Sequence, residues 1–304
     1  MVTILMGVWN GAQHLQMQLD SIVAQHHTNW HLFCSDDGSS DDSMDILQRF
    51  ARQYPSQITI RKGPKKGFAA NYMAMISAME HDVGFVCFAD QDDVWLPDKI
   101  GRALACLGEY ENHPALYCGR RIIWTPERGR ETWSPTIGRQ CSLRNALVEN
   151  IASGNTIMLN PKAAALAIKA AKQTSSVFAH DWWLYLLLTG CGGTIHFDPG
   201  KPQILYRQHR NNAIGNRQGL SAQFHRKKAV ICGLFSDRVG RNLDALRLVQ
   251  DMLTPAARHV IRDFAKARKT KGVHRLVALI RVAPYRQTWL GTIGFWGAAS
   301  LGRV

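Results

Sequence analysis

The feature that most constrains this chain is an apolar segment, residues 83–89, that runs directly into three aspartates, Asp90, Asp92 and Asp93. Such a run is typical of a central parallel strand that is covered on both faces. In open α/β sheets, ligands bind outside the carboxyl ends of the strands. Asp90 and Asp92 would therefore offer two hard oxygen ligands to Mg²⁺ or Mn²⁺ where the ion also holds a diphosphate. The alternative is a solvated acidic turn before the next helix.

The residues before this segment alternate between strand and helix patterns. Apolar strands are predicted at residues 2–8, 30–34 and 58–60, and an amphipathic helix follows each of them. Because short loops connect these elements, we predict a Rossmann-like, right-handed α/β layer over the first 110 residues or so. The chain has no Gly-x-Gly-x-x-Gly and no P-loop sequence, which disfavours a Rossmann dehydrogenase and a P-loop NTPase.

The second part of the chain has a different organisation. Its predicted elements are a helix over 97–110, a strand over 115–124, a polar loop over 128–139, a turn and strand over 151–160, helices opening at Pro161 and His180, and strands near 194–197 and 203–206. From about residue 221 only helical periodicity remains, interrupted at Pro255. We therefore predict an α/β domain over 1–220, in halves 1–110 and 111–220, and a helical extension over 221–304.

The net charge of +14 favours polyanionic partners, namely nucleic acid, an anionic bilayer or phosphorylated substrates. The cations concentrate in the extension, which also carries Trp289, Phe295 and Trp296. It is either a basic element at a membrane surface, anchored by these aromatic residues, or a helical subdomain with a solvated basic face. A nucleic-acid-binding protein without catalysis is the alternative from another class. Against it, the predicted edge of the sheet is acidic, and no nucleic-acid-binding motif is present.

The seven cysteines are scattered and form no Cys-x-x-Cys pair, so we expect reduced core residues and no disulfide framework. No apolar run reaches the roughly 18 residues of a membrane span, and no leader precedes the first strand. These observations predict a cytoplasmic protein, or one attached peripherally to the cytoplasmic face of the inner membrane.

Six short motifs, in this order along residues 1 to about 215, together resemble the inverting family-2 glycosyltransferases of the GT-A fold, in particular the bacterial rhamnosyltransferase-like branch. The motifs are Trp9-Asn10-Gly11, Asp36-Asp37-Gly38-Ser39-x-Asp41, Gly67-x3-Asn71, Asp90-Gln91-Asp92-Asp93-Val94-Trp95, His180-Asp181-Trp182-Trp183 and Arg207-Gln208-His209. Two departures are that Trp9 stands where the family often has Tyr, and that the Gln-x-x-Arg-Trp motif of processive members is absent. The resemblance implies a mixed, mainly parallel central sheet with a C-terminal α-helical extension.

The resemblance also implies a role for each motif. Asp90, Asp92 and His209 would hold the divalent cation, and Asp181 would be the catalytic base, although Asp181 also suits the N-cap of its helix and His209 a structural position. The residues expected to bind the nucleotide or donor are Val8, Asn10, Gly11, Asp36, Asp37, Gly67, Asn71, Asp90 and Gln91. Those expected to bind acceptor or sugar are Asp93, Trp95, Gly154, Asn155 and Trp182; core packing is the alternative for both tryptophans.

By the same resemblance, the reaction is the transfer of a sugar from a nucleotide-sugar, most similar to enzymes that use dTDP-L-rhamnose. The acceptor would be a lipid-linked saccharide of cell-surface polysaccharide assembly, of the O-antigen, capsule or lipopolysaccharide type. A UDP-sugar donor remains an alternative within the family. A metal-dependent nucleotidyl- or phosphosugar-transferase on a related fold is another, and it would release pyrophosphate.

Overall fold

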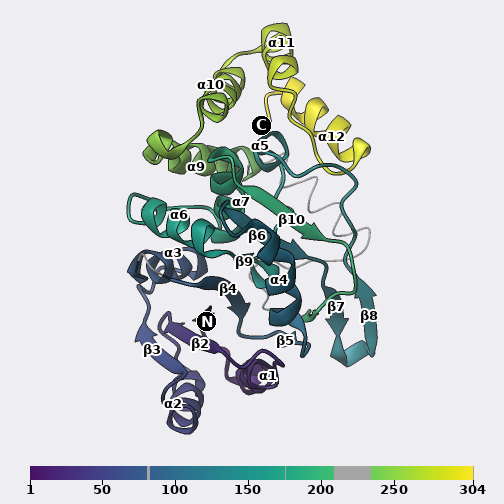
Figure 1. Cartoon of the computed structure of the whole chain (residues 1–304). Coiled ribbons are helices and arrows are strands. Elements are labelled where there is room, and N and C mark those ends of the chain that lie inside the picture. Colours follow the sequence, from purple (N-terminus) through teal and green to yellow (C-terminus); the bar gives the residue numbers. More distant parts are fainter. Residues whose placement is uncertain (81–82, 175, 209–233, 304) are drawn as a thin grey trace.

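The computed structural model of the chain describes residues 1–80, 83–174, 176–208 and 234–303. In these ranges the main sheet has seven strands in the order β10-β6-β9-β4-β1-β2-β3 (Figure 1). The strands are β1 (Val2–Val8), β2 (Trp30–Asp36), β3 (Ile58–Lys62), β4 (Phe85–Asp90), β6 (Ala115–Gly119), β9 (Met158–Leu159) and β10 (Thr194–Asp198).

The sheet is mixed and mainly parallel, as predicted. β1 pairs in parallel with β2 and β4, β2 with β3, and β6 with β10, whereas the short β9 lies antiparallel between β4 and β6. β4 and β6 therefore run in the same direction. The carboxyl ends of β1, β2, β4 and β6 consequently meet at one edge of the sheet. Asp90, the last residue of β4, lies at this edge.

Helices cover both faces of this sheet, which explains why its strands are apolar throughout. In β1, Ile4 and Met6 face a core shared with α1, α2 and α4, and Leu5 between them faces the core of α3, α6 and α7. These helices are α1 (Ala12–Val23), α2 (Ser43–Gln53), α3 (Phe68–Ala78), α4 (Lys99–Leu107), α6 (Pro161–Ala171) and α7 (His180–Gly190). α7 is buried along nearly its whole length, so it belongs to the centre of the molecule.

A smaller sheet, in the order β5-β11-β7-β8, continues from the edge where the aspartates lie. It consists of β5 (Val94–Trp95), β7 (Ile122–Thr125), β8 (Arg130–Trp133) and β11 (Ile204–Arg207). The prediction of one strand over 115–124 was wrong, because the chain leaves the main sheet at Arg120 and Arg121, whose charges do not suit a doubly covered strand. The predicted loop over 128–139 contains β8, which follows the left-handed Gly129.

The C-terminal helices pack onto the α/β part in the same core as α7. They are α9 (Leu234–Leu248), α10 (Pro255–Lys269), α11 (Gly272–Val282) and α12 (Trp289–Ser300), with a short 3₁₀ turn η4 (Gln250–Met252) between α9 and α10. Three further 3₁₀ turns lie in the α/β part, namely η1 (Gly108–Tyr110), η2 (Pro126–Arg128) and η3 (Gly154–Thr156). Pro255 does begin a new helix, with Thr254 as its side-chain cap. Within the described ranges, no helix is both long and apolar enough to cross a bilayer.

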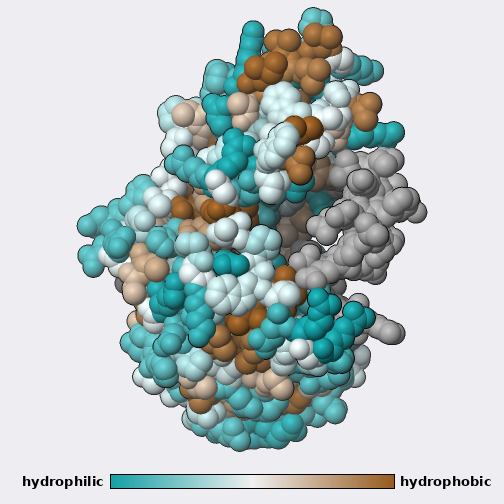
Figure 2. Space-filling view, turned by 90° about the vertical axis from the view of Figure 1, so that its right-hand side faces the viewer, coloured by the Kyte–Doolittle hydropathy of each residue, from teal (hydrophilic) through white to brown (hydrophobic). Residues whose placement is uncertain are grey.

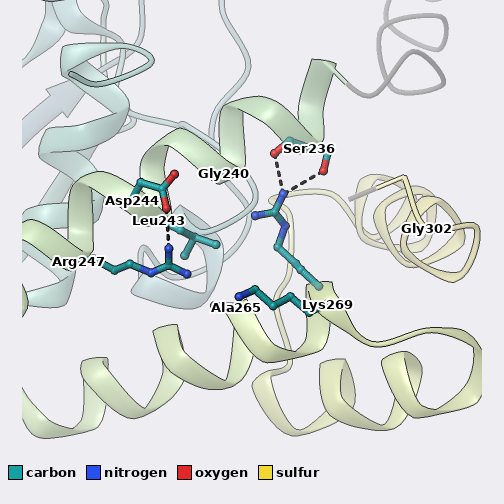
Figure 3. A pocket seen from close by; sticks show the side chains of 9 residues that line it. Ser236, Gly240, Leu243, Asp244, Arg247, Ala265, Lys269 and Gly302 are labelled. Atoms are coloured by element: carbon teal, nitrogen blue, oxygen red, sulfur yellow. Dashed lines mark hydrogen bonds and ion pairs between the residues drawn. The ribbon is translucent and has the colours of Figure 1, made fainter.

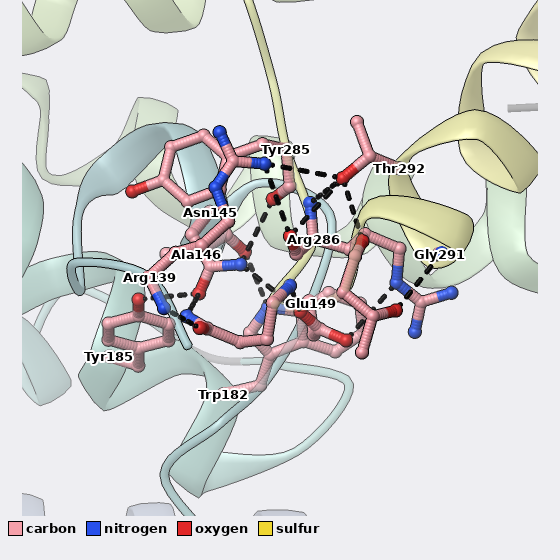
Figure 4. Close-up of polar contacts among 12 residues, drawn as sticks. Arg139, Asn145, Ala146, Glu149, Trp182, Tyr185, Tyr285, Arg286, Gly291 and Thr292 are labelled. Carbon is pink, nitrogen blue, oxygen red and sulfur yellow. Dashed lines mark hydrogen bonds and ion pairs between the residues drawn. The ribbon is translucent and has the colours of Figure 1, made fainter. Parts of the chain in front are cut away.

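The segment between α11 and α12 joins the extension to the α/β part (Figure 4). Asn145 in the short helix α5 (Leu143–Ala146) donates to the carbonyl of Tyr285 at 3.0 Å. Glu149 accepts from the backbone N–H of Gln287 at 2.6 Å and forms an ion pair with Arg286 at 3.2 Å. Tyr185 of α7 donates to the Asn145 side chain at 2.8 Å. The extension is thus hydrogen-bonded, through α5, to the helix that carries Asp181.

Candidate active site

The loops after β1 and β2 are fastened to each other at the carboxyl edge. Asn10 adopts a left-handed conformation with φ of 47°, its N–H donates to Ser39 Oγ at 2.9 Å, and its side chain accepts from the N–H of Ser40 at 2.8 Å. The N–H of Gly11 donates to Ser43 Oγ at 2.8 Å. Val8 is buried, and its carbonyl accepts from the N–H of Asp37. Val8, Asn10 and Gly11 therefore build one rigid pair of loops.

Both aspartates at the end of β2 are buried and accept hydrogen bonds from backbone groups. Asp36 accepts from the N–H groups of Gly38 and Ser39, each at 3.1 Å. Asp37 accepts from the N–H of Lys65 through one oxygen and from that of Gly67 through the other, each at 2.7 Å. These bonds hold the loop between β3 and α3 against β2. A nucleobase that bound to Asp37 would have to share its carboxylate oxygens with that loop.

Gly67 and Asn71 fix the start of α3. Gly67 has a φ of 89°, which suits glycine, and it immediately precedes the helix. Asn71 is buried; its amide donates to the Ser35 carbonyl at 2.8 Å and accepts from Ser35 Oγ at 2.6 Å. Both polar groups of Asn71 thus join α3 to β2.

Gln91 makes a two-point contact with the backbone of Trp9. Its Oε1 accepts from the Trp9 N–H at 2.8 Å and its Nε2 donates to the Trp9 carbonyl at 2.9 Å. A Cβ at Gly11 would overlap this amide, so position 11 requires a residue without a side chain. The glutamine between Asp90 and Asp92 therefore joins the turn after β4 to the loop after β1.

Asp90, Asp92 and Asp181 form the electrostatic centre of this edge. Burial, together with the negative charges of Asp92 and Asp181, raises the pKa of Asp90 to about 7, and Arg121 partly opposes the shift. The Tyr72 hydroxyl donates to the Ala89 carbonyl at 2.7 Å and lies 3.4 Å from Asp90. Negative charge therefore accumulates at the end of β4, which is the condition in which a cation binds strongly.

Asp181 is the second residue of α7 and faces this centre from the other half of the domain. The N-cap of α7 is Ala179, so Asp181 does not occupy the capping position that was its alternative role. One carboxylate oxygen accepts from the Gly154 N–H at 3.2 Å and the other from the N–H of Trp182 at 2.6 Å. The side chain is partly exposed.

All five residues expected at the acceptor or sugar are buried, and the backbone N–H of one of them, Gly154, donates to Asp181. Asp93 accepts from Asn155 at 2.6 Å and from the N–H of Arg207 at 3.3 Å, so it connects β4 to η3 and β11. Trp95 lies in the core, and Trp182 donates from Nε1 to the Ala146 carbonyl at 2.7 Å. The contact of Asp93, Asn155, Trp95 and Trp182 with a sugar stays a prediction. Burial favours packing for both tryptophans.

Sequence reasoning missed three cations beside the aspartates. Lys99 is buried with its ammonium 3.8 Å from the centre of the Trp95 ring; burial lowers its pKa, while Cys87, Asp93 and Asp90 oppose the shift. Arg121 donates to Ser153 Oγ at 2.6 Å and lies over Tyr206. Arg207 donates from Nε to the Asp92 carbonyl at 3.0 Å.

A signal for Arg121 was present in the sequence. Arg120 and Arg121 directly follow a strand, as Asp90 does, and parallel strands end at a common edge. Lys99 carried no such signal, because a lysine in the first turn of an amphipathic helix usually faces solvent.

The donor set fits a divalent cation. Asp90 and Asp92 supply the hard oxygen ligands that Mg²⁺ and Mn²⁺ prefer, and the raised pKa of Asp90 shows that its negative charge is not fully compensated. Within the described ranges, no three His, Cys, Asp or Glu side chains converge on one point, so the protein alone would supply a partial shell. His209, the third expected ligand, lies outside the described residues.

These features define an enzyme site on a nucleotide-sugar transferase fold, and the comparison with known families agrees. The chain belongs to glycosyl transferase family 2, whose family model matches residues 3–173. It is 29% identical over 228 residues to the dTDP-rhamnosyl transferase RfbG of Shigella flexneri, covering 73% of this chain and 77% of that protein. It is 27% identical over 101 residues to the Escherichia coli UDP-Glc:α-D-GlcNAc-diphosphoundecaprenol β-1,3-glucosyltransferase WfgD, covering 33% and 38%.

Solved structures confirm the GT-A fold. S. aureus TarS (residues 1–349) in complex with UDP-GlcNAc matches with a TM-score of 0.57 at 14% identity, covering 99% of this chain and 88% of that one. The mannosyltransferase PcManGT from Pyrobaculum calidifontis, in complex with GDP-Man and Mn²⁺, matches with a TM-score of 0.53 at 14% identity, covering 99% and 86%. At such identities the likeness shows the fold, while the family model and RfbG support a rhamnosyltransferase-like glycosyltransferase.

Proposed function

We propose that this enzyme transfers L-rhamnose from dTDP-L-rhamnose, with inversion, to a hydroxyl of a lipid-linked saccharide in the assembly of a cell-surface polysaccharide. The observation that carries the proposal is the placement of Asp181, from the second half of the domain, opposite Asp90 at the end of β4. The similarity to RfbG over most of both chains supports the donor, and the printed name of WfgD, with its diphosphoundecaprenol acceptor, supports a lipid-linked acceptor.

In this proposal each half of the edge has its own task. The loops after β1 and β2, held together by Asn10, Asp36 and Asp37, bind the nucleoside of the donor. Asp90 and Asp92 hold a divalent cation, which supplies positive charge for the departing diphosphate.

Asp181 acts as the base. Its partly exposed carboxylate accepts the proton of the acceptor hydroxyl while that oxygen forms a bond to the anomeric carbon and the bond from that carbon to the diphosphate breaks. The N–H groups of Gly154 and Trp182 each donate to one oxygen and orient the carboxylate, and each oxygen keeps a further lone pair for the acceptor hydroxyl. Arg121, which follows β6, carries a positive charge that acts on Asp90, and in this proposal it contacts the acceptor or the leaving group.

The family membership, which shows an enzyme, removes the alternative of a binding protein without catalysis. It also disfavours a nucleotidyltransferase. A UDP-sugar remains the second candidate donor, because TarS and WfgD are described with UDP-sugars.

Calorimetric titration of the purified protein with dTDP, UDP and GDP tests the donor. We expect binding of dTDP with Mn²⁺ and loss of that binding with EDTA. Binding of UDP alone would replace rhamnose by a UDP-sugar, and silence with all three nucleotides would contradict the proposed function.

We further propose that the enzyme works at an anionic cytoplasmic membrane surface through α11 and α12. Val273, Val277 and Ile280 are exposed along α11, and Trp289 and Leu290 at the start of α12 are 69% and 68% exposed. Figure 2 shows brown surface at the top of the molecule, where these helices lie. Apolar side chains beside a basic surface are typical of helices that lie in a membrane interface.

The structure changes the expected anchors. Phe295 is buried against Phe235, and Trp296 is partly buried with its Nε1 donating to the Pro284 carbonyl at 3.3 Å, so Trp289 is the one of the three aromatic residues that is free to enter a bilayer.

Replacing Trp289 and Leu290 together by serine should reduce binding to phosphatidylglycerol vesicles about tenfold or more, by the apolar area lost. The free energy of unfolding should change by less than about 0.5 kcal/mol, because both side chains are exposed. The exposed Trp133 of β8 provides a control, since Trp133→Ser removes an exposed tryptophan far along the chain from α12. Equal vesicle binding by all three proteins would contradict this surface.

A further inference from the structure

A second charged site lies outside the candidate active site, between α9, α10 and the residue Gly302 that follows α12. It is a pocket of about 370 Å³, within the range of small-ligand sites. Arg247, Arg268 and Lys269 line it together with one acid, Asp244. Figure 3 shows Arg247 and Lys269 on facing helices, with Ser236 at the other side of the pocket. None of the residues of the acidic edge takes part.

More cationic than acidic side chains lie at this pocket. Asp244 is paired with Arg247 at 2.7 Å, in a contact between two exposed side chains. Arg275 approaches the pocket at Gly302; its guanidinium donates to the carbonyls of Thr270, Ala299 and Arg268, which end α10 and α12. Asp244 and Asp237 act on the charge of Arg268, and these two acids stand against the four cations Arg247, Arg268, Lys269 and Arg275 at or beside the pocket.

Among the cations that line the pocket, Arg268 is the one whose side chain is hydrogen-bonded to the facing helix α9. One of its terminal nitrogens donates to the carbonyl and the hydroxyl of Ser236, at 2.7 and 2.9 Å. Its Nε is buried and has no hydrogen-bond partner among the described residues. Burial also lowers its pKa, so the folded protein holds this cation at a cost. An anion with several acceptor oxygens in the pocket would pair with the part of the Arg268 side chain that lines it and offset that cost.

The chemistry of the pocket selects a phosphate. Arginine presents a planar fork of donors that matches phosphate oxygens, and lysine adds a point charge. Leu301, next to Gly302, is 77% exposed, and Val273 at the start of α11 is 72% exposed. A ligand that carries both a phosphate and an apolar portion therefore suits this part of the surface better than a free ion.

We propose that the pocket between α9 and α10 binds the phosphate group of a phosphate ester, and that a lipid supplies that group. The proposal stands on residues that take no part in sugar transfer, so it does not depend on the proposed reaction.

The test uses the full chain with EDTA present, so that Asp90 and Asp92 hold no metal with which to bind phosphates. Two probes are titrated by calorimetry: inorganic phosphate, and dihexanoyl phosphatidic acid below its micelle concentration. The pocket variant is Arg247→Gln with Lys269→Gln. The control is Arg258→Gln with Lys266→Gln, which removes the same charge from exposed positions of α10 outside the pocket. Arg268 is left in place because it holds Ser236.

We expect the short-chain lipid to bind the native protein. Its affinity for the pocket variant should be at least about tenfold lower, and its affinity for the control variant should be within about twofold of that for the native protein. Tighter binding of the lipid than of inorganic phosphate supports the lipid source, and equal binding overturns that source. Equal losses in both variants, or no binding of either probe, overturn the site. Binding of dTDP with Mn²⁺ should be the same in all three proteins. A failure of the proposed phosphate site can therefore be distinguished from a failure of the proposed sugar transfer.

Discussion

The two halves of the acidic edge use the same residue types in opposite ways. After β1 and β2, the carboxylates of Asp36 and Asp37 each accept two hydrogen bonds from backbone N–H groups. At the end of β4, the charges of Asp92 and Asp181 raise the pKa of Asp90, so like charges face one another. The first arrangement stabilises loops, whereas the second costs stability unless a cation is present.

This contrast separates residues that shape a site from residues that perform its chemistry. Short Asp-rich motifs look alike in a sequence, yet Asp36 and Asp37 are buried and each accepts two backbone hydrogen bonds that hold a loop. Asp181 also accepts two backbone hydrogen bonds, but its side chain is partly exposed and its charge acts on Asp90. A carboxylate held against other carboxylates has a strong affinity for cations. The comparison therefore supports the proposal that Asp90 and Asp92 hold the metal, and it gives Asp36 and Asp37 the task of holding the loops after β1, β2 and β3.

The largest expected effect is on turnover. Asp181→Asn keeps the shape of the side chain and removes the base, so we expect turnover to fall about 10²- to 10⁴-fold. Binding of dTDP with Mn²⁺ should be unchanged, as measured by calorimetry. The matched variant Asp92→Asn should lose both turnover and metal-dependent binding. Unchanged turnover in the Asp181 variant would remove this residue from the mechanism.

Asp90→Asn should stabilise the protein without metal. The pKa of Asp90 is raised in the folded state, so the folded protein binds the proton more tightly than the unfolded chain does, and stability is lost as the pH rises from about 4 through about 7. Asparagine carries no charge. At about pH 8 in EDTA, we expect its free energy of unfolding to exceed that of the native protein by about 2–4 kcal/mol, less where water screens the charges. A lower value in urea denaturation would contradict the repulsion.

His180→Phe tests a neighbouring buried group. His180 stacks on Tyr72 at 3.9 Å between ring centres, and neither ring nitrogen has a partner among the described residues. Burial lowers its pKa to about 4. Its contribution is therefore complete above about pH 6.5 and is lost as the pH falls toward 4, a change of about 3 kcal/mol.

Phenylalanine keeps the stacking and does not titrate. The difference in unfolding free energy between about pH 7 and about pH 4 should therefore be smaller in the variant than in the native protein by about 3 kcal/mol. Because this difference is compared at two pH values, any general cost of fitting the larger ring cancels. Identical pH dependence in the two proteins would show that His180 is not held neutral.

The smallest expected effect concerns the nucleotide loops. Asp37→Asn places an NH₂ group opposite the N–H of Lys65 or Gly67, so one backbone donor loses its acceptor, at a cost of about 1–3 kcal/mol. The sign is opposite to that of Asp90→Asn. Asp42, an exposed aspartate of the same motif region, provides the control, and Asp42→Asn should leave thermal stability unchanged. Equal behaviour of Asp37 and Asp42 would remove the distinction between the two halves.

The sequence determined the architecture and the centre of the site. The continuous apolar run over 83–89 and the regular alternation of strands and helices indicated an α/β layer with a covered central strand, and chain direction then placed Asp90 at the carboxyl edge of the sheet. The order of the short motifs indicated the family. These features are local or follow from topology, so no knowledge of side-chain packing was needed.

The tertiary structure alone decided which polar and aromatic residues remain available. Trp95, Trp182 and Asp93 sit in motifs beside the site, yet packing buries them, and Lys99 lies under the aspartates although its helix gave no sign of it. Whether a side chain faces a ligand or a neighbouring element depends on contacts between residues far apart in the chain. Asn155 with Asp93 and Gln91 with Trp9 are such contacts, and their free energies appear only once the elements have packed.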